Sequence, residues 1–196
     1  MYRPLRKQAC SHESSAETFT ENSGLERSPI GTKLAPNPIL EGNGMPGKAH
    51  SHSLRSGRFS APGQIYMVTT RLSNGSRMFT NWQLGRLVVN ELRLVHDQDI
   101  GHSLAWVVMP DHLHWLFELR LGTLDRVLQR VKSRSAIALN RATGNTGRVW
   151  QTGYQDIAVR HDESLKHFAR YIVANPLRAG LVKSVRDYPL WDCKWL

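Results

Sequence analysis

The sequence predicts an α+β fold in which helices cover an antiparallel sheet, and three observations support this class. Runs of β-branched and aromatic residues alternate with segments whose apolar residues recur at helical spacing. A Pro-Asp turn separates two of the predicted strands, which is typical of a hairpin. The elements follow the order strand, helix, strand, strand, helix, strand, helix. The first six match the split βαβ pattern of a ferredoxin-like sandwich, and the seventh is an additional C-terminal helix.

Four strands are predicted from β-branched and aromatic runs bounded by turn residues, and they span residues 64–71, 102–109, 112–119 and 154–160. Pro62-Gly63 precedes the first strand. Pro110-Asp111 joins the second strand to the third, so we expect this hairpin next to or near the centre of the sheet.

Three helices are predicted from apolar residues spaced three and four apart. The first runs from Thr80 to about residue 96, with Thr80 or Asn81 as its N-cap. The second runs from residue 122 to about residue 141, and its expected inward-facing residues are Leu124, Val127, Leu128, Val131, Ile137 and Ala138. The last begins at Asp162 and ends near residue 174, because Pro176 disfavours helical conformation in the residue before it.

Composition indicates one basic domain of 58–196 that follows a disordered extension of 1–57. The chain has 196 residues, a formal net charge of +10 and a pI of about 10.1, and most of the positive charge lies in residues 58–196. A folded domain this basic favours a polyanionic partner, with nucleic acid as the first expectation. Residues 1–57 are rich in Ser, Gly, Pro, Asn and Glu and have no sustained apolar periodicity.

The cysteines and the hydropathy pattern favour a cytoplasmic protein, and the expected polyanion suggests association with the nucleoid. Cys10 and Cys193 are the only two cysteines, and they form no Cys-x-x-Cys pair that would suggest a thiolate zinc site. No apolar run reaches the ~18 residues that a membrane helix requires, and no secretory signal is evident. We therefore expect no membrane partner.

His112 and His114 form a His-x-His pair inside the third predicted strand. Residues two apart in a strand point to the same face, so the two imidazoles would lie side by side and could bind one metal ion. A second His-x-His pair, His50 and His52, lies in the polar extension, where no predicted element would hold the imidazoles in place. The first pair alone is therefore the candidate metal site.

Tyr171 and Asn175 lie four residues apart in the last predicted helix and share one of its faces. Each has an ordinary structural interpretation, Tyr171 as a core tyrosine and Asn175 as a C-terminal cap. Combined with the histidine pair, Asn175 offers an amide oxygen as a third metal ligand and Tyr171 a nucleophile. A phenol with a pKa near 10 attacks a phosphodiester only when a nearby cation makes the phosphorus electrophilic. Mg²⁺ prefers oxygen ligands and imidazole suits Mn²⁺, so the ligand set leaves the metal open between these two.

Several separated motifs in residues 58–190 resemble the REP-associated tyrosine transposases, a branch of the single-tyrosine, HUH transposases. Residues 109–114 (MPDHLH) resemble the His-hydrophobic-His motif, and residues 171–182 (YIVANPLRAGLV) resemble the nucleophile helix and the segment after it. Residues 132–134, 140–141, 147–156 and Arg160 resemble the segments between these motifs.

The resemblance implies a metal-dependent DNA single-strand endonuclease and strand transferase. It implies that Tyr171 forms a 5′-phosphotyrosine, that His112 and His114 bind the Mg²⁺ or Mn²⁺ ion, and that Asn175 is the third ligand. It further implies repetitive palindromic hairpin DNA as the target, and a monomer, although a dimer stays open.

Basic residues in the same segments are expected to bind the DNA backbone. Ring stacking on unpaired bases is one interpretation of Trp150 and Tyr154, and core packing is the other. The expected nucleic-acid-binding residues are Arg126, Arg130, Lys132, Arg134, Arg141, Arg148, Arg160 and Arg178.

Three alternatives remain open from the sequence. The same histidines would serve a metal-dependent phosphodiesterase that uses water as its nucleophile. A non-catalytic, domesticated nucleic-acid-binding protein would need neither the histidines nor the tyrosine. A histidine-triad-like nucleotide hydrolase is weaker, because Trp115 and Leu116 interrupt the further histidine run that it requires.

Overall fold

The computed structural model describes residues 60–159 and 162–195, with the backbone alone in residues 162–164. The predicted disordered extension, residues 1–57, lies outside these described residues, as do His50, His52 and Arg160. The order of elements confirms the predicted alternation and adds a final strand. The elements are β1 (Ile65–Arg71), α1 (Trp82–Asp97), β2 (Gly101–Val108), β3 (His112–Leu119), α2 (Leu124–Thr143), β4 (Gln155–Val159), α3 (Asp162–Val173), α4 (Asn175–Arg178) and β5 (Trp191–Cys193). Short 3-10 turns span Ser73–Gly75, Met78–Thr80 and Val185–Asp187.

The strands that the structure describes form one five-stranded sheet in the order β4-β1-β3-β2-β5, and every neighbouring pair is antiparallel. β3 lies between β1 and β2, so the two strands joined by α1 are separated by a third, as the split βαβ pattern predicts. The ferredoxin-like α+β fold is therefore confirmed. The β2–β3 hairpin occupies the middle of the sheet, where its turn is held on both sides.

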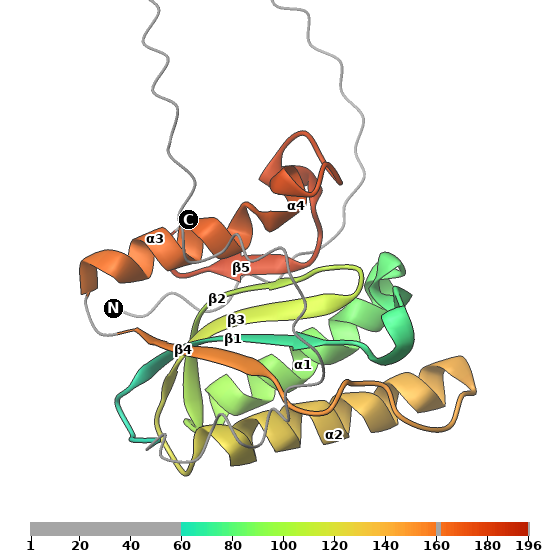
Figure 1. Ribbon diagram of the computed structural model, residues 1–196, viewed down its shortest axis with the longest axis horizontal. Helices are drawn as coiled ribbons and strands as arrows, with labels where there is room; N and C mark the ends of the chain where they lie inside the picture. Colours follow the sequence, from blue (N-terminus) through green and yellow to red (C-terminus); the bar gives the residue numbers. More distant parts are fainter. Residues whose placement is uncertain (1–59, 160–161, 196) are drawn as a thin grey trace, which may run out of the picture. The chain divides into compact units, whose positions relative to one another are not determined.

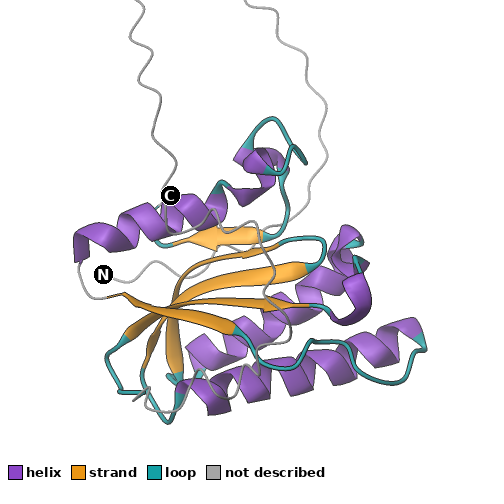
Figure 2. Cartoon of the chain, in the orientation of Figure 1, coloured by secondary structure: helices purple, strands orange, loops and turns teal. Residues whose placement is uncertain are grey.

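The helices lie on both faces of the sheet. Figure 1 shows α1 and α2 on one side and α3 on the other, where α3 contacts β2, β3 and β5. Figure 2 shows the same two helical layers by secondary structure. α1 is capped by Asn81, whose side chain accepts a hydrogen bond from the backbone of Gln83. α2 is capped by Thr123 and ends at Gly144, which adopts a left-handed conformation that favours glycine.

The predicted inward face of α2 is wrong at one position. Ile137 is 62% exposed, whereas Ser135 and Leu139 are completely buried. Ser135 fits the core because its hydroxyl donates to the carbonyl of Val131 and accepts from the indole of Trp150, so the buried polar group is satisfied. Because Ser135 is polar, the apolar pattern did not mark it as buried, and the predicted helix face included Ile137 in place of Leu139.

β5 and the segment before it form an element that the periodicity of the sequence did not predict. β5 extends the sheet by pairing with β2. Before it, the Tyr188 hydroxyl donates to the carbonyl of Val108, and Leu190 packs against Gly85 of α1, where a side chain larger than hydrogen would collide with it. The tail therefore packs back on the domain and holds the end of β2.

α3 ends at Val173, close to the predicted end, but the break falls at Ala174, and Asn175, which Pro176 was expected to exclude from helix, begins α4. The proline lies in the first turn of α4, where its missing N–H has no helical partner to lose. Arg178, the last residue of α4, lies beside Tyr171 of α3. Within the described residues, no helix has the length and hydropathy needed to cross a membrane.

Candidate active site

The tight turn between β2 and β3 positions the histidine pair. The backbone N–H of Met109 donates to the carbonyl of His112 at 2.7 Å, which closes the turn around Pro110 and Asp111. β3 begins directly at His112, so His112 and His114 point to one face of the sheet. The residues between and beyond them, Leu113 and Trp115, point to the other face and are buried.

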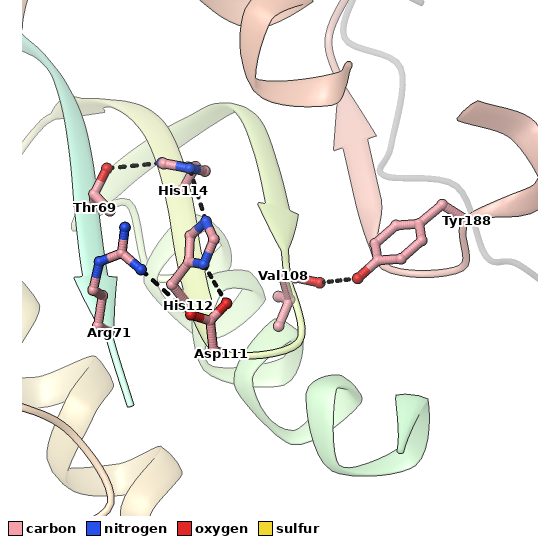
Figure 3. A network of polar contacts seen from close by, with 7 residues as sticks. All are labelled: Thr69, Arg71, Val108, Asp111, His112, His114 and Tyr188. Atoms are coloured by element: carbon pink, nitrogen blue, oxygen red, sulfur yellow. Dashed lines mark hydrogen bonds and ion pairs between the residues drawn. The ribbon is translucent and has the colours of Figure 1, made fainter. Parts of the chain in front are cut away.

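The two imidazoles face each other through the same ring atom. Nε2 of His112 lies 3.0 Å from Nε2 of His114 (Figure 3). The other ring nitrogens are both engaged: Nδ1 of His112 lies 2.6 Å from Oδ1 of Asp111, and Nδ1 of His114 lies 2.7 Å from Oγ1 of Thr69. Each imidazole is therefore fixed by a different partner, one charged and one neutral.

The register of the sheet explains why Thr69 reaches His114. In β1, Thr69 is the cross-strand partner of His114, and Arg71 is the partner of His112. Directly opposed residues of antiparallel strands have side chains on the same face, close enough for a hydrogen bond. The same row continues through Val107 of β2 to Trp191 of β5. The site is thus built on the rigid middle of the sheet rather than on a loop.

These contacts favour the tautomer that a metal site requires. Because a carboxylate can only accept, Nδ1 of His112 carries the hydrogen and Nε2 presents its lone pair. The Thr69 hydroxyl can accept from Nδ1 of His114 in the same way. Two lone pairs 3.0 Å apart repel each other unless a proton or a cation lies between them. Histidine ligands of metals commonly donate their second N–H to a carboxylate or another acceptor, and this pair has that arrangement.

Both histidines are held neutral at physiological pH. Burial, together with the charges of His112, Arg71 and Arg178, lowers the pKa of His114 to about 3, although the charge of Asp111 acts in the opposite direction. Burial also lowers the pKa of His112, although the hydrogen bond and charge of Asp111 act in the opposite direction. Neutral imidazoles bind cations, so the site is prepared for a metal ion rather than for an anion.

Asp111 is held ionised by its neighbours. Burial alone would raise the pKa of its carboxyl, but the hydrogen bond and charge of His112 and the charge of Arg71 outweigh it, and the pKa falls. The guanidinium of Arg71 lies 3.3 Å from the second carboxylate oxygen. Asp111 therefore contacts both Arg71 and His112, and it orients the imidazole of His112 through its Nδ1 atom.

The two histidines fit a divalent ion, but among the described residues no third acidic, histidine or cysteine ligand joins them. Within the part of the chain that the structure describes, no group of three or more such residues is arranged to hold a metal. Asn175 donates its amide nitrogen to the carbonyls of Tyr171 and Ile172, at 2.9 and 3.1 Å, and so caps the end of α3. Asn175 therefore acts as a helix cap, as its ordinary structural interpretation predicts. Its amide oxygen, and not its nitrogen, is the atom that could bind a metal ion.

Tyr171 is partly buried near the end of α3, on the helical layer that covers β2, β3 and β5. The guanidinium carbon of Arg178, at the end of α4, lies 4.3 Å from the centre of its ring. The charge of the same arginine acts on His114. Because Arg178 is adjacent to Tyr171 and within electrostatic reach of His114, α3 and α4 lie on the histidine face of the sheet.

Most of the basic residues predicted to bind DNA lie on one helix. Arg126, Arg130, Lys132, Arg134 and Arg141 belong to α2, which covers the face opposite to α3. Three of them serve the fold: Lys132 donates to the carbonyls of Gln151 and Gly153, Arg134 pairs with Glu91, and Arg130 bonds to Gln98.

The loop between α2 and β4 is packed by its aromatic residues. Arg148 in this loop donates to the hydroxyl of Thr152 at 3.2 Å. Trp150 is 5% exposed, and Tyr154 donates its hydroxyl to Asp125 at 2.6 Å. Core packing is therefore the role of Trp150, and Tyr154 is tied to α2.

Thr69, Asp111 and Arg71 are residues of the site that reasoning from the sequence missed. Asp111 was interpreted only as a turn residue and Thr69 only as a strand residue. The adjacency of Asp111 to His112 was a visible signal, since metal-binding histidines often have a carboxylate partner. Thr69 had no such signal, because its role depends on the register between β1 and β3.

A known protein family matches the segment of the chain that contains most of this candidate site. The family described as "Transposase IS200 like" matches residues 86–175, which contain both histidines, Tyr171 and Asn175. Over this segment the chain is similar to the IS200-like transposases. Its predicted family resemblance is thereby confirmed.

Curated relatives of the chain include the REP-associated tyrosine transposase of Escherichia coli (strain K12). The two are 28% identical over 136 residues, which cover 67% of this chain and 78% of the relative. A solved structure of a REP-associated tyrosine transposase bound to a REP hairpin is similar in fold, with a TM-score of 0.58. Its sequence identity is 26%, and the match covers 68% of this chain and 79% of that chain.

Proposed function

We propose that this protein is a tyrosine transposase that cuts one strand of hairpin DNA with Tyr171 and retains the cut end as a 5′-phosphotyrosine. One observation carries the proposal: two Nε2 atoms 3.0 Å apart, with both Nδ1 atoms already engaged, lie on the sheet face that α3 covers. A cation site and a tyrosine on the facing helix are the parts that phosphoryl transfer to a phenol requires.

His112 and His114 would hold a divalent ion, Mg²⁺ or Mn²⁺, with Asn175 or water completing its ligands. When bound, the ion would polarise a non-bridging phosphate oxygen and neutralise charge that develops in the transition state. Asp111 and Thr69 would keep both imidazoles in the ligand tautomer. The sheet would hold the pair in place, because its hydrogen-bond register fixes each side chain.

Tyr171 would attack the phosphorus through its hydroxyl oxygen. A bond forms between that oxygen and phosphorus, and the bond from phosphorus to the 3′ oxygen of the preceding nucleotide breaks. The phenolic proton is lost, and the departing 3′ oxygen takes up a proton. The energy of the phosphodiester remains in the phosphotyrosine, so the 3′-hydroxyl of another strand can reverse the step without a nucleotide cofactor.

A palindromic hairpin is the proposed target. The relative whose solved structure is most informative is bound to a REP hairpin, and it shares the fold over more than two thirds of its length. A net charge of +10 supports an electrostatic attraction to DNA. A monomer, with Tyr171 acting on the histidine pair of its own chain, is the simplest arrangement.

The proposal is tested by incubating the protein and Mn²⁺ with single-stranded hairpin oligonucleotides from its own genome. Wild-type protein should give a protein–DNA band that survives denaturation, and Tyr171→Phe should give none. A His112→Ala, His114→Ala double variant should bind the hairpin but form no band.

Each alternative predicts a different pattern in this experiment. Cleavage without a covalent band, retained in Tyr171→Phe, would support a phosphodiesterase that uses water. Hairpin binding with no cleavage by the wild type would support a domesticated binding protein.

A further inference from the structure

Arg178 has a position that no other described arginine shares. It is the last residue of α4, two residues after Pro176, and its guanidinium carbon lies 4.3 Å from the centre of the Tyr171 ring. A guanidinium stacked on an aromatic face is attracted by the electrons of the ring, and the planar group is held parallel or tilted over it. The ring of Tyr171 and the guanidinium of Arg178 are therefore in direct contact.

The donors of Arg178 are not consumed by the protein. Its side chain is exposed, and within residues 60–159 and 162–195 no carboxylate or carbonyl accepts a hydrogen bond from it. Other arginines of the domain are engaged, such as Arg134 with Glu91 and Arg71 with Asp111. Stacking through the ring face leaves the N–H edge of the guanidinium open, and that edge binds two oxygens of one phosphate.

The charge of Arg178 also reaches the histidine pair. It is one of the positive charges that, after burial, lower the pKa of His114. A single guanidinium thus lies beside the hydroxyl-bearing ring and within electrostatic reach of the cation site. A phosphate placed between Tyr171 and His114 would lie against it.

We propose that Arg178 is a catalytic residue whose guanidinium binds a non-bridging oxygen of the phosphodiester that Tyr171 attacks. This inference rests on the proposed function and assigns one role within it. Arg178 donates hydrogen bonds and keeps its protons, while the new bond forms at the Tyr171 oxygen and the bond to the 3′ oxygen breaks. Its donors are oriented before the reaction by the ring, so they stabilise the charge that develops on phosphorus oxygens in the transition state.

The experiment compares Arg178→Ala, Arg178→Lys and a control, Arg170→Ala, which removes an exposed arginine from the same helix as Tyr171. Two quantities are measured for each: the Kd for the hairpin by fluorescence anisotropy, and the rate of covalent adduct formation at saturating protein. Mn²⁺ affinity is measured as well, to show that the histidine pair is intact.

Arg178→Ala should lower the saturated rate by about 10²- to 10³-fold, the effect typical of losing one preorganised donor, with a Kd within about threefold of wild type. Arg178→Lys should recover part of the rate, because it restores charge without the planar edge. Arg170→Ala should leave the saturated rate unchanged. A saturated rate for Arg178→Ala within about threefold of wild type would overturn the assignment, as would an equal loss in Arg170→Ala.

Failure of the proposed function has a different signature. If wild-type protein forms no adduct with any hairpin tested, the phosphotyrosine mechanism fails, and the role of Arg178 fails with it. If wild type and Arg178→Ala form the adduct equally fast, the mechanism stands and only the role of Arg178 is overturned.

Discussion

The hydroxyl of Thr69 lies 2.7 Å from Nδ1 of His114, and this contact fixes which nitrogen of His114 faces His112. Thr69→Val keeps the shape of the side chain and removes the acceptor, so the ring loses its orientation and its tautomer preference. We expect Mn²⁺ affinity, measured by calorimetry or electron paramagnetic resonance, to fall by roughly 10- to 100-fold, the usual effect of losing such a partner. Thr69→Ser should bind Mn²⁺ nearly as well as wild type. Equal affinity in Thr69→Val and wild type would contradict the role of this hydroxyl.

Asp111 supports His112 through charge as well as through a hydrogen bond. Asp111→Asn keeps an acceptor oxygen but loses the negative charge, whereas Asp111→Ala loses both. We therefore expect Mn²⁺ affinity to decrease in the order wild type, Asp111→Asn, Asp111→Ala. The thermal unfolding of the metal-free proteins serves as the control, because an ion pair as accessible to solvent as that of Asp111 and Arg71 contributes little to folding. Identical affinity in all three proteins would show that the aspartate only forms the turn.

Tyr188 makes stability depend on pH in the alkaline range. Burial and the charge of Asp111 raise the pKa of its hydroxyl to about 12, whereas in the unfolded chain it is near 10. Between pH 10 and pH 12 the unfolded state loses this proton and the folded state keeps it, so stability falls as pH rises. Tyr188→Phe lacks this proton, and the difference in unfolding free energy between the two proteins should narrow from pH 9 to pH 11. A constant difference across this range would contradict the burial of the hydroxyl.

The face of α2 that enters the core is tested by two substitutions. Leu139 is completely buried, so Leu139→Ala should lower the free energy of unfolding by about 2–5 kcal/mol. Ile137 is 62% exposed, so Ile137→Ala should change it by no more than about 0.5 kcal/mol. Urea denaturation measures both. A larger loss in Ile137→Ala than in Leu139→Ala would restore the helix face that the sequence predicts.

Local patterns in the sequence predicted the elements but not their register. The period-2 run after Pro110 was sufficient to place His112 and His114 on one strand face. The spacing of Leu124, Val127, Leu128 and Val131 was sufficient for the start of α2. β5 has only three residues and owes its conformation to pairing with β2, a contact distant in sequence that no local pattern encodes.

For the candidate site, the sequence likewise predicted some residues but not their contacts. The metal pair and Tyr171 followed from residue type and spacing. Their contacts did not: the role of Thr69 depends on strand register, and Arg178 was expected among the DNA-binding residues but not beside Tyr171. Many of the basic residues proposed from α2 turned out to serve the fold, because composition does not distinguish a solvated cation from one that binds a carbonyl.

The most direct measurement is mass spectrometry of the denaturation-resistant adduct formed with a hairpin oligonucleotide and Mn²⁺. After digestion by protease and nuclease, the proposed mechanism predicts a nucleotide joined through its 5′-phosphate to Tyr171 and to no other residue, together with a free 3′-hydroxyl on the released strand. A nucleotide attached to another residue, or cleavage that leaves no protein-bound nucleotide, would contradict Tyr171 as the nucleophile.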